Sequence, residues 1–109
     1  MSPGKSNKLS GTNGFRSRRA ARELLEGVLR EGRSLEEASE TCKLFLSLSS
    51  RDRAFAWLLV LSCLRHLGEI DALINVCLER PLSKKAYRAK DLLRLGITQI
   101  LFVGTPNYA

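Results

Sequence analysis

Apolar residues recur at steps of three and four along most of this chain, which is the spacing of one face of an α-helix. The first such stripe predicts a helix from about Arg16 to Glu31. Gly32 is expected to end it, because glycine favours the left-handed position that follows many helices. No segment alternates with a period of two between turn residues, so the sequence predicts no strands. The expected inward residues of this helix are Ala21, Leu24, Leu25, Val28 and Leu29.

A second helix is predicted to begin after Ser34. Ser34 and Glu37 have the spacing of a capping box, in which the serine hydroxyl and the glutamate carboxylate each accept a hydrogen bond from a backbone N–H group. The segment 47–50 then forms a turn that can cap the following helix. The expected apolar face of the second helix is Leu35, Ala38, Cys42, Phe45 and Leu46.

The third predicted helix is the central and longest one. Apolar residues surround much of its circumference between Phe55 and Leu64, as in a helix that is buried on several sides. The stripe continues past Gly68 without a break, so we predict a single helix from about Ser50 to Glu79, roughly 45 Å long. Pro81 ends it, because proline disfavours helical backbone in the residue before it.

After a connector over residues 82–86, a last helix is predicted from about Tyr87 to Val103. It is strongly apolar, and few predicted elements remain to cover it. The pattern therefore predicts an all-α bundle of about four helices, occupying residues 16–109 and incomplete at its C-terminal end. The expected inward residues of the last helix are Ala89, Leu92, Leu93, Gly96, Ile100 and Val103.

The positive charge is concentrated at the N-terminus. The formal net charge is +7, and the first 22 residues carry no acidic residue at all. Residues 1–15 are rich in Gly, Ser and Asn, which predicts a disordered basic arm. A cationic segment beside a helical domain favours a polyanionic partner, and RNA is the first candidate. The basic residues of this segment are Lys5, Lys8, Arg16, Arg18, Arg19 and Arg22.

These six residues are the first predicted RNA-binding group. Arg18 and Arg22 lie one helical turn apart, and a guanidinium group can donate two parallel hydrogen bonds to a phosphate. A second basic run, with Lys84, Lys85 and Arg88 as its candidates, could widen the surface. The alternative for both groups is a solvated charged surface. Phe15 is expected to pack at the start of the first helix, with stacking on an RNA base as the alternative.

Other functional classes find little support in the sequence. The longest apolar run, Ala54–Leu64, is shorter than the roughly 20 residues that a bilayer requires, and no secretory signal is present, so we expect a cytoplasmic protein without a membrane partner. His66 is the single histidine. We predict no metal site and no catalytic residue, because no nucleophile–base pair or ligand spacing occurs. Three cysteines are expected as buried apolar residues, namely Cys42, Cys63 and Cys77.

Several short motifs also carry a family resemblance through their order and spacing. The most specific is the run from Leu93 to Phe102. Together they resemble the N-terminal domain of the Sun/Fmu-type methyltransferases that form 5-methylcytosine in small-subunit rRNA, a domain of the NusB family of antitermination factors. The other motifs are Arg18-Arg19-Ala20-Ala21, Gly32-Arg33-Ser34-Leu35, Arg51-Asp52-Arg53-Ala54, Leu64-Arg65-His66, Asp71-Ala72-Leu73-Ile74, Arg80-Pro81-Leu82, and Pro106 with Tyr108-Ala109.

The resemblance implies a NusB-like helical bundle that positions small-subunit rRNA for a downstream methyltransferase domain. S-adenosylmethionine and the catalytic cysteines would belong to that domain, so no cofactor is expected in this chain. The family's domain continues into further helices past Pro106, which predicts that the chain is a fragment. The alternative is a transcription antitermination-type factor or protein-interaction module that regulates transcription. It would dock through the uncovered apolar face of the last helix.

Overall fold

The computed structural model describes residues 3–104, with side chains from residue 14 onward. Within this part of the chain the structure contains helices and connecting turns and no strand, which confirms the all-α prediction. The helices are α1 (Pro3–Leu29), α2 (Leu35–Thr41), α3 (Lys43–Ser47), α4 (Ser50–Arg65), α5 (Leu67–Cys77) and α6 (Tyr87–Thr98), with a 3-10 turn at Lys84–Ala86 and a π-helical turn at Gln99–Val103.

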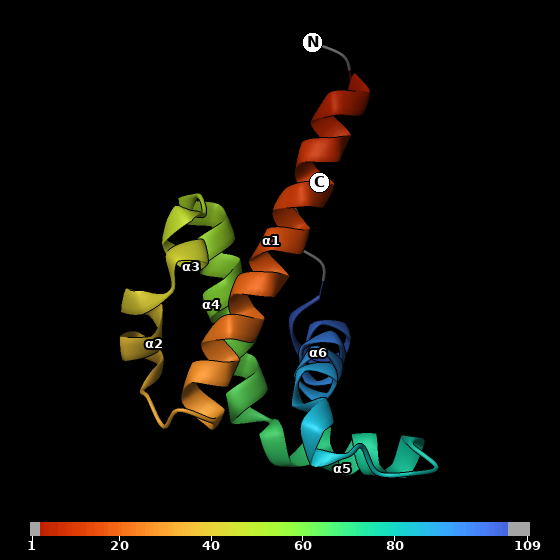
Figure 1. Cartoon of the computed structure of the whole chain (residues 1–109). Helices are drawn as coiled ribbons and strands as arrows, with labels where there is room; N and C mark the ends of the chain where they lie inside the picture. Colours follow the sequence, from red (N-terminus) through yellow and green to blue (C-terminus); the bar gives the residue numbers. More distant parts are fainter. Residues whose placement is uncertain (1–2, 105–109) are drawn as a thin grey trace.

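Helix α1 is the axis of the fold. Figure 1 shows it beside α4 and α6, and it also contacts the short helices α2 and α3. Ala21, Leu24 and Leu25 are fully buried on it, as predicted, because the apolar stripe faces the other helices. Val28 and Leu29, also predicted to point inward, are partly buried against the same core.

The backbone of α1 is helical from Pro3, although residues 1–15 were predicted to form a disordered arm and the helix to begin near Arg16. Proline is favoured at the first helical position, and no proline follows it within this helix. The glycines in this segment each cost about 1 kcal/mol relative to alanine, which weakens a helix without forbidding it.

The predicted capping box at the start of α2 is present. The backbone N–H of Glu37 donates to Ser34 Oγ at 3.1 Å, and that of Ser34 donates to Glu37 Oε1 at 2.9 Å. The single second helix was wrong, because the backbone is extended at Cys42 and divides it into α2 and α3. Cys42 Sγ then accepts from the N–H of Phe45 as the cap of α3. Leu46, predicted to face inward, is 51% exposed after this break.

The predicted long helix over residues 50–79 is also divided, at His66, where φ is −111° and ψ is 20°. The apolar stripe crosses the break, since Cys63 and Ile70 on either side of it are both buried. Figure 1 shows why a break is needed: α4 follows α1, whereas α5 runs in another direction, beneath the start of α6. Burial on several sides was wrong as well, because Leu58 of α4 is 48% exposed.

Helix α6 presents a different face to the core from the predicted one. Asp91, Leu95 and Thr98 are buried, and they lie at steps of four and three along the helix. Of the residues expected to point inward, Val103 packs against the core. Exposed instead are Ala89, Leu92, Leu93 and Ile100. The rotation leaves apolar side chains uncovered along α6 and the π-helical turn, consistent with the predicted uncovered face.

Candidate nucleic-acid interface

The predicted arginines of α1 point in different directions. Arg16 Nη2 donates to Ser47 Oγ at 2.8 Å and so ties α1 to α3. Arg18 is exposed, and two residues along a helix correspond to a rotation of about 200°, which places Arg18 almost opposite Arg16. The structure therefore does not bring Arg16 into one surface with Arg18. The side chains of Lys5 and Lys8 lie outside the described ones.

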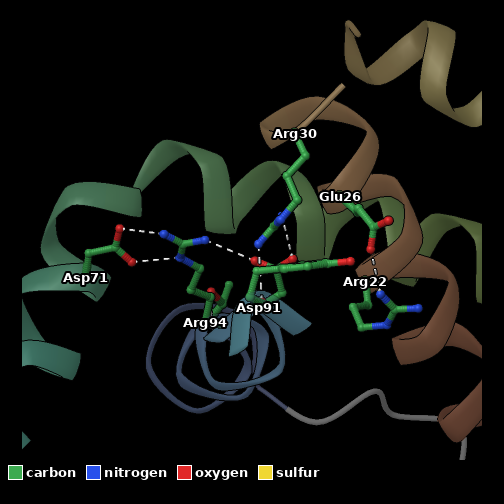
Figure 2. A network of polar contacts seen from close by, with 8 residues as sticks. Arg22, Glu26, Arg30, Asp71, Asp91 and Arg94 are labelled. Carbon is green, nitrogen blue, oxygen red and sulfur yellow. Dashed lines mark hydrogen bonds and ion pairs between the residues drawn. The ribbon is translucent and has the colours of Figure 1, made fainter. Parts of the chain in front are cut away.

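Arg19 and Arg22 each face a glutamate one turn further along α1. Arg19 Nε lies 3.9 Å from Glu23 Oε2, and the Arg19 side chain is 62% exposed. Arg22 Nη1 donates to Glu26 Oε1 at 3.0 Å, and the Arg22 side chain is only 17% exposed (Figure 2). Exposed helical ion pairs are weak, so the Arg19 guanidinium remains available to a ligand, whereas Arg22 is more firmly held.

A groove runs between α1 and α6 beside these arginines. It has a volume of about 470 Å³ and combines charged and apolar lining residues. A second hollow of about 530 Å³ shares Arg18 and Gly96 with the first and continues past Ile100 to Gly104. The lining of the first hollow, which we call the α1–α6 groove, is Phe15, Arg18, Arg19, Arg22, Leu92, Leu95 and Gly96.

The α1–α6 groove joins two features that the sequence analysis treated separately. The arginines of α1 form one wall, and the α6 residues Leu92, Leu95 and Gly96 form the other. This juxtaposition was not predicted, because Leu92 was expected to lie inside the bundle. Only the rotation of α6 brings it to the rim, where it is 55% exposed.

Phe15 is not at the start of a helix, contrary to the prediction that it packs there. Helix α1 begins at Pro3, and Phe15 lies within it with 60% of its surface exposed. Its ring lines the α1–α6 groove together with the arginines that follow it. The structure thus leaves a large aromatic surface free beside cationic groups.

The second predicted basic group lies elsewhere. Lys84 and Lys85 are exposed on the 3-10 turn, and Arg88 is exposed in the first turn of α6. At 1.5 Å per residue along α6, Arg88 lies about 6 Å from Leu92 and about 12 Å from Gly96. None of the three residues lines the α1–α6 groove, although Arg88 lies one helical turn from its lining residue Leu92.

Arg94, in the same basic run, takes part in a partly buried network instead (Figure 2). Its side chain is 11% exposed, and Nε and Nη2 donate to the two carboxylate oxygens of Asp71, each at 2.8 Å. Arg94 Nη1 also donates to Asp91 Oδ1 at 3.0 Å. Asp71 lies on α5, and Asp91 and Arg94 lie on α6, so Arg94 joins α5 to α6.

Asp91 is the buried centre of this network. Its side chain has no exposed surface, and its Oδ2 lies 2.9 Å from Arg30 Nη1 in an ion pair without hydrogen-bond geometry. Arg30 also lies 4.2 Å from the centre of the Tyr87 ring and donates to the Tyr87 carbonyl at 3.2 Å. Two arginines thus compensate a carboxylate that would be costly to bury alone.

Within this network, the contact between Asp71 and Arg94 shifts the pKa of each residue towards its charged form. Hydrogen bonds from Arg94 hold the pKa of Asp71 below its ordinary value, and the same contact raises the pKa of Arg94. The shifts widen the pH range over which both groups are charged. The network links α1, α5 and α6, and α1 and α6 are the two helices that line the α1–α6 groove.

The cysteines and the single histidine lie in different environments. Cys42 and Cys63 are buried, and burial raises the pKa of each thiol, whereas Cys77 is exposed, contrary to the prediction. His66 stacks on Phe102, with ring centres 3.9 Å apart. In the part of the chain that the structure describes, no three His, Cys, Asp or Glu residues are grouped to hold a metal ion. No described helix is long and apolar enough to cross a membrane.

Comparisons with known proteins identified one matching family and several proteins of similar sequence. Residues 15–109 match the NusB family. Proteins named ribosomal RNA small subunit methyltransferase B from Escherichia coli O1:K1 / APEC and Shigella boydii serotype 18 are each 30% identical over 92 residues. These alignments cover 84% of this chain and 21% of each relative, so the chain spans about a fifth of their length.

No solved structure gave a significant match. The family match nevertheless covers almost all of the described helices, from the residue before the arginines of α1 to the end of the chain. It includes both walls of the α1–α6 groove and every member of the buried ion network. On this basis the chain belongs to the NusB family.

Proposed function

We propose that residues 16–109 form an RNA-binding domain whose contact surface is the arginine wall of the α1–α6 groove. The observation that carries this proposal is the exposure of Arg18 and Arg19 on the rim of a groove in a NusB-family domain. The net charge of +7 supports it, since the positive charge favours association with a polyanion.

Small-subunit rRNA is the proposed RNA, because the relatives are named as methyltransferases of that molecule. In this proposal the domain positions rRNA for an S-adenosylmethionine-dependent cytosine methyltransferase domain encoded downstream. Catalysis and cofactor binding are assigned to that second domain, and this chain contributes RNA binding alone. Recognition depends on phosphates and on RNA shape more than on base-specific hydrogen bonds.

The proposal predicts a characteristic salt dependence. Each phosphate that an arginine neutralises releases counterions, so the logarithm of the affinity falls linearly with the logarithm of the salt concentration. Removal of two phosphate contacts should reduce that slope by about 1.4 for a single strand. Contacts of apolar groups leave the slope unchanged.

The test measures binding of a fluorescent small-subunit rRNA fragment over a range of KCl concentrations. The Arg18→Ala/Arg19→Ala variant should bind more weakly and with a smaller slope than the unmodified chain. The matched control is Lys43→Ala/Arg65→Ala, which removes the same charge from exposed positions outside both predicted basic groups. Equal losses in the two variants would mean that only the overall charge matters, and would contradict the proposed surface.

A second function is favoured by the uncovered apolar residues after α6. Ile100 is 80% exposed and Leu101 57% exposed, and such residues in a row are typical of protein contacts. The alternative is therefore a protein-interaction module, of the kind that regulates transcription by antitermination. A complex formed through this surface should survive high salt and should be insensitive to Arg18→Ala/Arg19→Ala, which separates it from RNA binding.

A further inference from the structure

We infer that the α1–α6 groove accepts an unstacked nucleobase of single-stranded RNA, with Phe15 as its stacking surface and Arg18 and Arg19 on the neighbouring phosphates. The inference rests on the proposed function and deepens it, because it names the form of RNA that the arginine wall would bind. Its basis is the combination of an exposed aromatic ring, an apolar wall and a cationic rim in one hollow.

The groove has the chemical character of a nucleotide site. Its interior is apolar, with Leu95 forming a floor that is 2% exposed and Leu92 a partly exposed side wall. Its volume of about 470 Å³ lies within the roughly 300–1,000 Å³ of sites that hold small molecules. A nucleotide combines a flat apolar base with an anionic phosphate, and the groove offers a complementary surface to each part.

Phe15 supplies the surface on which a base can stack. Phe15 is 60% exposed, and it lines the groove together with Arg18 and Arg19, which lie three and four residues further along α1. Arg18 and Arg19 follow it within one helical turn, so a base on the ring would bring its phosphates near their guanidinium groups. Aromatic rings beside positively charged grooves are the usual platform for single-stranded nucleic acids.

Gly96 keeps the groove open on the α6 side. No atom lies within 4 Å of the position that a Cβ at this residue would occupy. Gly96 and Arg18 also line the second hollow, so an added side chain at Gly96 would project into the space that the two hollows share. The position therefore offers a substitution that adds side-chain volume to the groove from a Cβ with no packed atom within 4 Å.

A single strand fits these features better than a duplex or an acidic peptide. A duplex hides the faces of its bases, so the apolar floor and the Phe15 ring would gain nothing from it. An acidic peptide could pair with the arginines, but it has no flat base to place against the Phe15 ring and the apolar floor. An RNA that lacks one base therefore tests whether the groove binds a base in addition to the phosphates.

The test uses a short single-stranded RNA, the same RNA with one abasic position, and the corresponding duplex. Phe15→Leu removes the ring and keeps an apolar side chain, and Gly96→Leu fills the groove. We expect each variant to bind the single strand roughly 5- to 100-fold more weakly, as for the loss of one stacked base, with an unchanged salt slope. The abasic position is then moved along the strand. At one position, the missing base should weaken binding to the unmodified chain but should not weaken binding to either variant further.

Gly68→Leu is the matched control for Gly96→Leu. Gly68 is a helical glycine on α5 that also has no atom within 4 Å of its Cβ position, and it lies outside the groove. It should leave RNA binding unchanged. Circular dichroism and thermal unfolding of all three variants verify that the helices are retained.

The outcomes separate this inference from the proposed function. If Phe15→Leu and Gly96→Leu bind the single strand as the unmodified chain does, while Arg18→Ala/Arg19→Ala weakens binding, the nucleobase site is wrong and RNA binding by the arginines stands. Equal affinity for single strand and duplex would also overturn the nucleobase site. Failure of the unmodified chain to bind either RNA would overturn both.

Discussion

Asp91 on α6 lies 2.9 Å from Arg30 at the end of α1, and this ion pair helps to fix which face of α6 turns towards the bundle. Arg94 holds the other oxygen of the same carboxylate and extends the contact to Asp71 on α5. With Asp91 turned inward, Leu92 is turned outward into the α1–α6 groove. We therefore expect the network to support the α1–α6 groove, to which it contributes no lining side chain.

Replacing Asp91 with alanine should destabilise the protein strongly. The change leaves Arg30 and Arg94 without their shared carboxylate, and breaking a buried ion pair from one side typically costs about 3–5 kcal/mol. Urea unfolding followed by circular dichroism measures the loss. A cost below about 1 kcal/mol would show that the network does not hold α6 in place.

Acid should remove the contribution of Asp71 in a defined pH range. The folded-state pKa of Asp71 lies below its ordinary value of 3.8, because Arg94 donates to its carboxylate. The stabilisation is therefore complete above pH 3.8 and is lost as the pH falls through the lower folded-state pKa. Unfolding free energies of the unmodified chain and of Asp71→Asn should differ at neutral pH and converge in strong acid. A constant difference down to the lowest pH would contradict this assignment.

The three thiols should differ in reactivity. Cys77 is exposed, whereas Cys42 and Cys63 are buried and burial raises the pKa of each, which lowers their thiolate fraction. A colorimetric thiol reagent should modify one cysteine rapidly in the folded protein and the other two only after denaturation. The fast phase should disappear in Cys77→Ser, and its persistence there would show that a buried thiol is accessible.

Removing the negative partner of Arg22 should strengthen RNA binding. Glu26 holds Arg22 at 3.0 Å, so Glu26→Gln would release a positive charge on the groove wall. The affinity for the rRNA fragment should rise by up to roughly fivefold at low salt, as expected for a partly exposed pair of about 1 kcal/mol. Glu40→Gln makes the same change in net charge at an exposed position on α2. If both variants gain equally, Arg22 has no special part in binding.

The local pattern of the sequence was sufficient to predict much of the fold. The steps of three and four gave the all-α class, and the burial of Leu24 and Leu25 followed from the stripe on α1. The capping box of Ser34 and Glu37 was also predicted, since both partners lie within one turn. The motifs that resembled the NusB family were confirmed by the family match. The helical class, the buried stripe and the capping box each depend on residues that are close together along the chain.

The sequence did not predict where the helices break or how α6 is rotated. The apolar stripe continues across His66, so periodicity alone favours one helix where the structure has α4 and α5. The rotation of α6 depends on Arg30 and Asp91, which are far apart in the sequence and meet only in the folded protein. An ion pair can place a charged residue inward where the apolar pattern would place a leucine.

The sequence by itself therefore determined the helical class, the family and the presence of an arginine cluster in α1, because spacing and composition specify them. The tertiary structure alone decided that Arg18 and Arg19 face an apolar wall of α6, and that Arg16 and Lys84 lie away from them. The physical reason is that the apolar pattern of a helix specifies its buried face only approximately, so a range of rotations about the helix axis agrees with it. Packing against the other helices and ion pairs between distant residues then determine which of these rotations occurs.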